Sequence, residues 1–433
     1  MTSKKDDNAV PIPKFGRYSD AYKTKFQYER WDEALLLFER KEYVASMGAL
    51  LDFICDGQEQ NAYYTQKDNG IEFSLIQGSK IIKGYVNTEG VSAEVAVVKA
   101  PKLNLRLMRK LMETNLEFRF CRFALSEDII CLKYHAFLPD AIPDKLYYTF
   151  REMAISADHY DDILTHDFPG LQNIDMSPIE ELSAEDKFIK YKYFQLWISR
   201  ALEIIKKMDI NSQAIPISYI LLNTAYKIDF LLVPQGQLHE KIEYINNLFY
   251  TESDMAFSER NTRTILEFEK LLLLPKEEVY KELYQTKATF GLATHAKPFQ
   301  VLEAINSILN DFNQFADRRF PELNRVMLEY AAQFSLYHLG MPAVLCDLLK
   351  IVVMVVNAGF LGELGYSPLL IDNEKQTPNV QPIEAELQYI QQEARKTMPN
   401  FSLDINKIKF NSIDEFLLTY LQELSQANFR DKL

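Results

Sequence analysis

The spacing of apolar residues changes along this chain, and that change limits the folds it can adopt. Ile71, Phe73 and Leu75 alternate with polar residues, and a second alternating run covers residues 91–97. A period of two is typical of β-strands that bury one face. From Ser183 onward, apolar residues recur instead at helical spacing. The sequence therefore predicts an α+β fold in which an antiparallel sheet with flanking helices precedes an all-helical region.

Turn-forming residues separate the expected strands. Asn69-Gly70 can adopt the positive φ angles of a tight hairpin, and Gly78-Ser79 and Glu89-Gly90 mark two later turns. Helical spacing occurs before, between and after the strands. The expected order is helix, β-meander, helix, β-hairpin and helix, with helical spacing at residues 31–54, 105–112 and 143–168 and hairpin strands near residues 116–120 and 130–134.

The chain is too long for one ordinary hydrophobic core, because 433 residues exceed the usual size of a single domain. The helices of the second half show no fixed repeat period, which favours an irregular bundle, with an irregular repeat array as the alternative. We expect a flexible leader at residues 1–27, an α+β domain at residues 28–170, a linker at residues 171–182 and an α-helical domain at residues 183–433.

Charge and cysteine content limit the functional classes. The 48 basic and 61 acidic side chains give a net charge of −13, so there is no electrostatic support for binding nucleic acid. The four cysteines form no CxxC pair and lie among apolar neighbours, which is typical of reduced thiols in the cytoplasm. The longest apolar run, residues 343–356, contains two charges and is too short to span a bilayer, so no membrane contact is expected.

Several residues of the first third resemble a known family. These are Trp31-Asp-Glu-Ala-Leu, Lys41-Glu-Tyr43 and the closing run Ala157-Asp-His-Tyr-Asp-Asp-Ile-Leu164, taken with the order of helices and strands. Together they resemble the YbjN-type, type III secretion chaperone-like domains of bacteria. The resemblance implies a cytoplasmic protein that binds or regulates other proteins, often as a homodimer, and it offers no catalytic residues. The long helical region is a departure from minimal members of that family.

The end of the third expected helix carries a candidate metal site. His159, Asp162 and His166 fall on one helical face, and imidazole and carboxylate groups suit zinc or another divalent ion. The alternative is a solvated helix end, since His159 and His166 would lie about 10 Å apart along the axis at roughly 1.5 Å per residue. This face defines the alternative hypothesis of a metal-dependent enzyme.

A basic cluster provides a candidate site for an anion or a partner protein. Arg106, Arg109 and Lys110 could share one helix face and meet an acidic segment or a phosphate group. The alternative is a solvated face balanced by Glu113 and Glu117. The chain has neither a phosphate-binding Walker loop nor a GxSxG motif.

We therefore expect a non-catalytic protein that binds a protein partner and requires no cofactor. Its sheet face or an exposed strand edge would receive an extended or helical segment of that partner. Two other hypotheses are the metal-dependent enzyme and a scaffold protein in which the helical domain does the binding.

Overall fold

The computed structural model describes residues 15–16, 20–57, 59–174, 177–251, 254–287, 290, 293–316, 321–366, 370–372 and 374–429. Its contacts divide the chain into two units. The sheet unit comprises residues 17–181 and 284–292, and the helical unit comprises residues 1–16, 182–283 and 293–433. The predicted fold class, an N-terminal antiparallel sheet with flanking helices followed by an α-helical region, is confirmed.

The described part of the sheet unit contains a seven-stranded sheet. Six strands are ordered β1-β2-β3-β4-β6-β5 with antiparallel neighbours, and β7 pairs with β4. The alternating residues Ile71, Phe73 and Leu75 are all buried on one face, as expected from the period of two. The strands are β1 (Ala62–Lys67), β2 (Gly70–Gln77), β3 (Lys80–Val86), β4 (Gly90–Lys99), β5 (Arg122–Ser126), β6 (Ile129–Phe137) and β7 (Gln172–Asn173).

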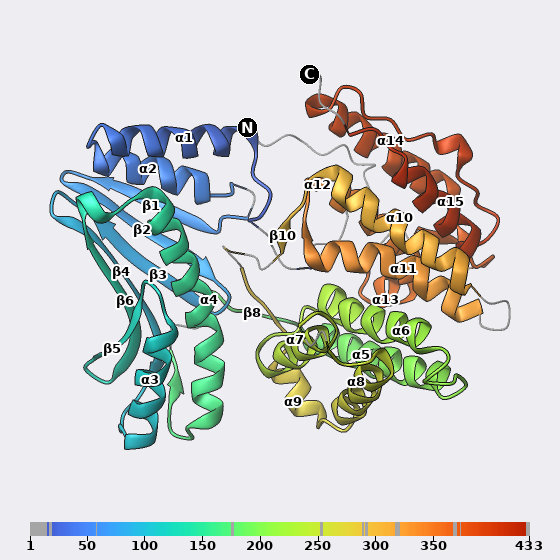
Figure 1. Cartoon of the computed structure of the whole chain (residues 1–433), viewed down its shortest axis with the longest axis horizontal. Helices are drawn as coiled ribbons and strands as arrows, with labels where there is room; N and C mark the ends of the chain where they lie inside the picture. Colours follow the sequence, from blue (N-terminus) through green and yellow to red (C-terminus); the bar gives the residue numbers. More distant parts are fainter. Residues whose placement is uncertain are drawn as a thin grey trace. The chain divides into compact units, whose positions relative to one another are not determined.

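Helices cover the inner face of this sheet. They are α1 (Lys25–Glu39), α2 (Tyr43–Ile54), α3 (Leu105–Glu117) and α4 (Pro143–Asp167), with a 3-10 turn η1 (Leu138–Asp140) before α4. Helix α4 contacts the central strands β2, β3, β4 and β6, and α2 packs beside it against β1 and β2 (Figure 1). Their side chains complete one apolar core that includes Leu50, Phe73 and Phe150.

The outer face of the sheet is largely polar, and it also exposes the aromatic side chains of Tyr63, Tyr85 and Phe137. One row of neighbouring residues crosses five strands through Ser74, Lys83, Glu94, Lys133 and Arg122. Lys133 Nζ and Glu94 Oε2 form an ion pair of 3.0 Å within this row. Antiparallel sheets commonly bury one face and leave the other to solvent, and this sheet follows that pattern.

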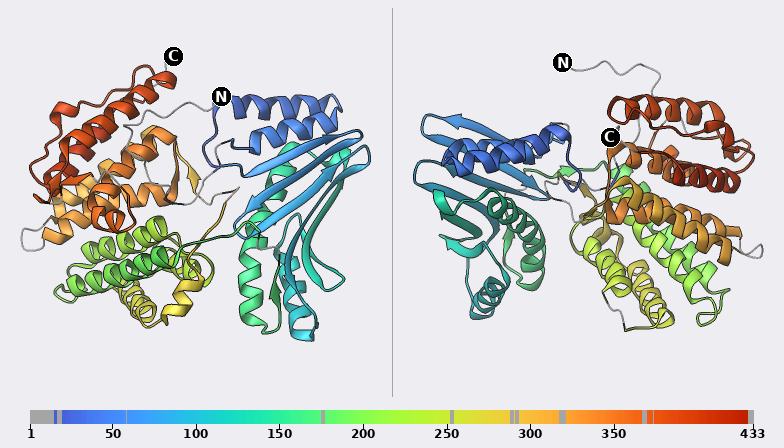
Figure 2. Two further views of the ribbon diagram at one scale, coloured as in Figure 1. Left: turned by 180° about the vertical axis from the view of Figure 1, so that it is seen from behind. Right: turned by 45° about the horizontal axis from the view of Figure 1, so that its top comes forward.

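The described part of the helical unit packs around one large core. Helix α11 is central, since it contacts α6, α10, α12 and α15, and Figure 2 shows these helices from two further sides. The helices are α5 (Ala184–Ile205), α6 (Ala214–Lys227), α7 (Gly236–Tyr250), α8 (Phe257–Leu272), α9 (Lys276–Lys281), α10 (Pro298–Phe315), α11 (Pro321–His338), α12 (Ala343–Val356), α13 (Ala358–Glu363), α14 (Val380–Thr397) and α15 (Ile413–Ser425).

Short elements complete the structure. A π-helical turn η2 (Ile228–Leu232) ends α6, a 3-10 turn η3 (Ile405–Lys407) precedes α15, and the remaining strands form two-residue pairs. These pairs are β8 (Glu180–Glu181) with β9 (Tyr284–Gln285), β10 (Thr294–His295) with β11 (Leu339–Gly340), and β12 (Ile371–Asp372) with β13 (Thr377–Pro378). No helix in the described ranges is long and apolar enough to cross a membrane.

One segment lies outside its predicted domain. Residues 284–292 fall in the predicted helical domain, but their contacts assign them to the sheet unit. The Lys287 carbonyl accepts a hydrogen bond of 2.6 Å from the Gly78 N–H, and the Gln77 side chain accepts one from the Phe290 N–H. Phe290 joins the core of the sheet unit with 2% of its surface exposed. Tyr284 and Gln285 form strand β9, and Lys287 forms an antiparallel bridge with Gly78.

The predicted N-terminal boundaries also differ from the structure. Residues 1–14 and 17–19 of the expected leader lie outside the described residues, but α1 already begins at Lys25, capped by the Thr24 side chain. Asp20 and Lys23 are buried, and the Tyr147 hydroxyl donates a hydrogen bond to Asp20. The sheet unit therefore begins before residue 28. Within the expected linker, β7 extends the sheet.

The strand expected at residues 116–120 is found at β5 instead. Helix α3 continues to Glu117, because Thr114 is still buried one turn before its end. The Asn115 side chain then donates a hydrogen bond to the Phe123 carbonyl and accepts one from the Phe123 N–H, which holds the start of β5 next to α3.

Candidate functional site

Helix α3 lies at the end of the sheet unit opposite α1 in all three views (Figures 1 and 2). The Asn104 side chain caps its first turn by accepting a hydrogen bond of 2.8 Å from the Leu107 N–H. Leu107 and Thr114 are buried, and Leu111 between them is half-buried. These residues form the inner face of α3, which packs against β5.

The opposite side of α3 is also apolar and is exposed. Leu105, Met108, Met112 and Leu116 expose 77%, 46%, 68% and 87% of their surface. Their spacing of three, four and four residues places them in one line along the helix, named here the α3 stripe. This side of α3 is therefore a candidate surface for interaction, since single exposed apolar residues are ordinary but an aligned group is not.

The helical unit offers no comparable surface in its described part. Its exposed large apolar residues number at most two on any one helix, for example Tyr244 and Tyr250 on α7 and Phe257 and Leu266 on α8. The α3 stripe therefore distinguishes the sheet unit as the unit with an aligned apolar surface on one helix.

The predicted basic cluster lies on one side of α3, and Arg109 is the member of it that borders the α3 stripe. Arg106 and Arg109 are exposed and Lys110 is half-buried; the Arg106 guanidinium lies 5.4 Å from the centre of the Phe168 ring. At about 100° per residue, Arg109 and then Glu113 follow the stripe on one side of the helix. Within the described chain, the side chains of Arg109, Glu113 and Glu117 form no hydrogen bond or ion pair. Both interpretations of this cluster, a site for an anion or a partner protein and a solvated face balanced by Glu113 and Glu117, stay predictions.

A groove of about 410 Å³ lies between the segment that follows α3 and one face of α4. The Glu152 carboxylate at this groove accepts hydrogen bonds from three successive backbone N–H groups, those of Arg119, Phe120 and Cys121, at 2.8, 2.8 and 3.0 Å. Burial acts to raise the pKa of Glu152, but these donors hold it below its ordinary value. The charged carboxylate therefore anchors the C-terminal end of α3 to α4. Tyr148 and Arg151 of α4 complete one wall of the groove.

The residues of the predicted metal site do not converge. His159 and His166 are exposed on α4, Asp162 is half-buried, and His166 Nδ1 lies 3.1 Å from Asp167 Oδ1. Across the described ranges, no group of three or more His, Cys, Asp or Glu side chains is placed so that it could hold a metal ion. The helical face of His159, Asp162 and His166 is thus not assembled into a coordination site in this structure.

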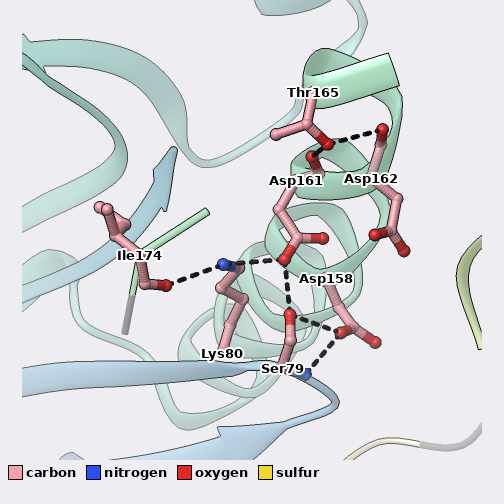
Figure 3. A network of polar contacts seen from close by, with 7 residues as sticks. All are labelled: Ser79, Lys80, Asp158, Asp161, Asp162, Thr165 and Ile174. Atoms are coloured by element: carbon pink, nitrogen blue, oxygen red, sulfur yellow. Dashed lines mark hydrogen bonds and ion pairs between the residues drawn. The ribbon is translucent and has the colours of Figure 1, made fainter. Parts of the chain in front are cut away.

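The same helix contributes instead to a buried polar network that the sequence did not reveal. Lys80 Nζ lies 2.8 Å from Asp161 Oδ2 and donates a hydrogen bond of 3.2 Å to the Ile174 carbonyl (Figure 3). The Ser79 hydroxyl donates to Asp161 at 2.6 Å, and the Ser79 N–H donates to Asp158 at 2.8 Å. Burial raises the pKa of Asp161, although Lys80 and Ser79 act against this rise.

This network has a structural role. Lys80 and Asp161 are almost inaccessible, so neither can contact a substrate. The adjacent Gly78 has a φ of 54°, and a Cβ at this position would lie 1.8 Å from Asp158 Oδ1. The turn between β2 and β3 can therefore approach α4 this closely only with glycine at position 78.

These observations define a chain with an α+β sheet unit that carries an exposed apolar stripe on α3, followed by a helical unit. No profile of a known protein family matches the chain. No curated protein matches it in sequence either. The resemblance to YbjN-type, type III secretion chaperone-like domains stays a prediction.

Proposed function

We propose that this chain is a non-catalytic protein that binds a protein partner through the outer face of α3. The observation that carries this proposal is the α3 stripe, in which four large apolar side chains face solvent in one line. Burying each such side chain in an interface contributes roughly 1.5–3 kcal/mol, so the stripe gives a partner a substantial apolar contact. Methionine and arginine are also enriched in protein interfaces, and the stripe contains two methionines and is bordered by Arg109.

The inner face of α3 holds this surface in place. Leu107 on the inner face of α3 is fully buried, and Glu152 holds the segment that follows the last turn of α3. A docking helix that is anchored at its inner face and at its C-terminal end loses little conformational freedom when a partner binds, which favours affinity. The surface that would contact the partner is thus preformed on α3.

The proposed setting is the cytoplasm. All four cysteines are free, as expected in a reducing compartment. A regulatory or chaperone-like role would follow from the resemblance in the first third of the chain. The scaffold hypothesis has less support, because the described helical unit has at most two exposed large apolar residues on any helix.

Capture of partners by a stripe variant tests the proposal. The double variant Met112→Glu, Leu116→Glu places two charges in the stripe, and Phe137→Glu is the control, because Phe137 is 65% exposed on β6, away from α3. Circular dichroism first establishes that both variants are folded. The captured partner is then purified and its binding is measured by calorimetry. We expect it to bind the unmodified chain and the control, and to fail to bind the stripe variant. Equal binding to all three chains would show that α3 is not the docking face.

A further inference from the structure

The groove between α4 and the segment that follows α3 has the lining of a small-molecule site. We propose that it binds a small organic anion. The carboxylate or phosphate group of this ligand pairs with Arg119 and Arg151, and its apolar body lies against Tyr148 and Ile155. All residues that line the groove belong to the sheet unit. None of them is part of the α3 stripe, so this ligand site goes beyond the proposed function and does not depend on it.

The two walls of the groove are distant in the sequence but are fixed to each other. Tyr148, Arg151 and Ile155 recur at intervals of three and four residues and therefore share one face of α4. The segment after α3 provides the other wall, which includes Arg119. The Glu152 carboxylate on α4 accepts a hydrogen bond of 2.8 Å from the Arg119 N–H. The site is thus preformed, and a ligand loses little affinity to the cost of ordering it.

The charged side chains of the lining favour an anion. Arg119 and Arg151 contribute two guanidinium groups, whereas the carboxylate of Glu152 is already directed at three backbone N–H groups. The Arg119 side chain is exposed, and within the described ranges it forms no hydrogen bond or ion pair. A guanidinium can bind a carboxylate or a phosphate through two parallel N–H groups, which gives both strength and orientation.

Two hydroxyl groups add further polar partners. Tyr148 and Ser156 both line the groove, and neither hydroxyl forms a hydrogen bond in the part of the chain that the structure describes. Each hydroxyl can donate to an oxygen atom of a ligand. A few convergent polar groups on a mostly apolar wall are typical of sites for small molecules.

The apolar part of the lining favours an organic anion over an inorganic one. Phe120, Tyr148 and Ile155 present aromatic and aliphatic surface, and Tyr148 exposes 54% of its surface. Inorganic phosphate would leave this surface in water, whereas an apolar body would bury it. The groove of about 410 Å³ falls within the range of roughly 300–1,000 Å³ for small-molecule sites.

Titration of the full chain with matched probes tests the ligand class. The probes are phenylacetate, phenyl phosphate, the neutral 2-phenylethanol and inorganic phosphate, each raised to about 20 mM, because ligands of this size reach a Kd on the order of 1 mM. The δ1-methyl NMR signal of Ile155 reports binding at the groove, and its loss in Ile155→Leu assigns it. We expect at least one aromatic anion to shift this signal to saturation, and the tighter of the two identifies the charged group. The neutral probe and inorganic phosphate should bind at least about tenfold more weakly.

Substitution of Arg119 tests the charged contact. Arg119→Gln removes the guanidinium but keeps the backbone N–H that bonds Glu152, so it should weaken binding of the aromatic anion by at least about tenfold. Arg119→Lys keeps the charge without the paired N–H geometry and should give an intermediate affinity. Arg40→Gln is the matched control, because Arg40 is an exposed arginine of the same unit and does not line the groove. Circular dichroism establishes that each variant is folded.

The results that would overturn the ligand site are specific. They are an unmoved Ile155 signal with both aromatic anions, equal affinity for 2-phenylethanol, or unchanged affinity in Arg119→Gln. A shift caused only by a glutamate-rich peptide would also overturn it and would assign the groove to a protein segment. The Met112→Glu, Leu116→Glu variant should bind the probes as the unmodified chain does, so failure of the docking face and failure of the ligand site are separate results.

Discussion

Lys80 Nζ and Asp161 Oδ2 lie 2.8 Å apart, and their side chains expose only 1% and 2% of their surface. This ion pair joins the start of β3 to α4 inside the sheet unit. Ser79 and the Ile174 carbonyl add hydrogen bonds to the two charged groups. Because a buried charge is costly without its partner, the pair is expected to hold the turn between β2 and β3 on α4 in a single arrangement.

Removal of one member of the Lys80–Asp161 pair should therefore strongly destabilise the sheet unit. We expect Asp161→Ala to lower the free energy of unfolding of the sheet unit by about 3–5 kcal/mol, because Lys80 is left buried and uncompensated. The paired replacement Lys80→Met, Asp161→Leu should recover most of this loss. Urea unfolding followed by circular dichroism measures both effects. Glu94→Ala, which breaks the exposed pair with Lys133, is the control and should cost less than about 1 kcal/mol. A similar small cost for Asp161→Ala would contradict the interpretation.

Phe290 should be an anchor of the sheet unit, although it lies between helices of the helical unit in the sequence. Its ring contacts Tyr147 edge to face with centroids 5.6 Å apart, within the core of the sheet unit. We expect Phe290→Ala to cost about 3–5 kcal/mol, the usual loss for a buried phenylalanine. Phe137→Ala, which truncates an exposed ring of the same unit, should cost much less. Equal effects of the two substitutions in urea unfolding would show that residues 284–290 are not integral to the sheet unit.

His338 should make the helical unit sensitive to acid. Burial lowers the pKa of His338 to about 4, and its Nε2 lies 2.8 Å from the Tyr226 hydroxyl. In the unfolded chain, the His338 imidazole takes up its proton near pH 6.5. The contribution of neutral His338 to the free energy of unfolding is therefore complete above that pH and is lost as the pH falls toward 4. From pH 7 to pH 5 the expected loss is up to about 2 kcal/mol, which His338→Gln should remove. Thermal unfolding at both pH values checks this, and an identical pH dependence of the two chains would exclude the effect.

Glu152 should stabilise the sheet unit in its charged form, whereas His338 stabilises the helical unit in its neutral form. Its folded pKa is lowered, so its contribution is present above the ordinary pKa of glutamate and disappears as the pH falls through the folded value. We expect Glu152→Gln to lower the free energy of unfolding by about 1–2 kcal/mol at neutral pH, because a neutral amide is a weaker acceptor for three N–H groups. Glu117→Gln is the control, as the Glu117 side chain has no partner in the described chain. Amide hydrogen exchange at Arg119 and Phe120 should accelerate only in the first variant.

Local patterns were sufficient for most elements of the sheet unit. The alternation of Ile71, Phe73 and Leu75 requires a strand with one buried face, and the turn at Gly78 requires a residue tolerant of positive φ. The start of α4 at Pro143 was also predicted, since proline suits the first turn of a helix. These features depend on neighbours close in the sequence, so they can be inferred without the fold.

The candidate site was predictable only in part. Arg106, Arg109 and Lys110 were identified from their charge, and Arg109 borders the α3 stripe. The stripe itself was not identified, because α3 has apolar residues on two faces and spacing alone cannot tell which face is covered. That choice is made by packing between α3 and β5, which leaves Leu107 buried and Met112 in solvent.

Long-range contacts account for the other differences. Residues 276–287 have helical spacing, yet Tyr284 and Gln285 pair with β8 and Phe290 enters a core built from residues more than a hundred positions earlier. Likewise, Asp161 and Lys80 are ordinary surface residue types that become a buried pair only when α4 crosses β3. Periodicity and turn chemistry determine which elements this chain forms, because those are local properties of the backbone. Which faces are covered, which charges meet and which face stays exposed depend on packing between distant segments, and the free energy of burial decides them.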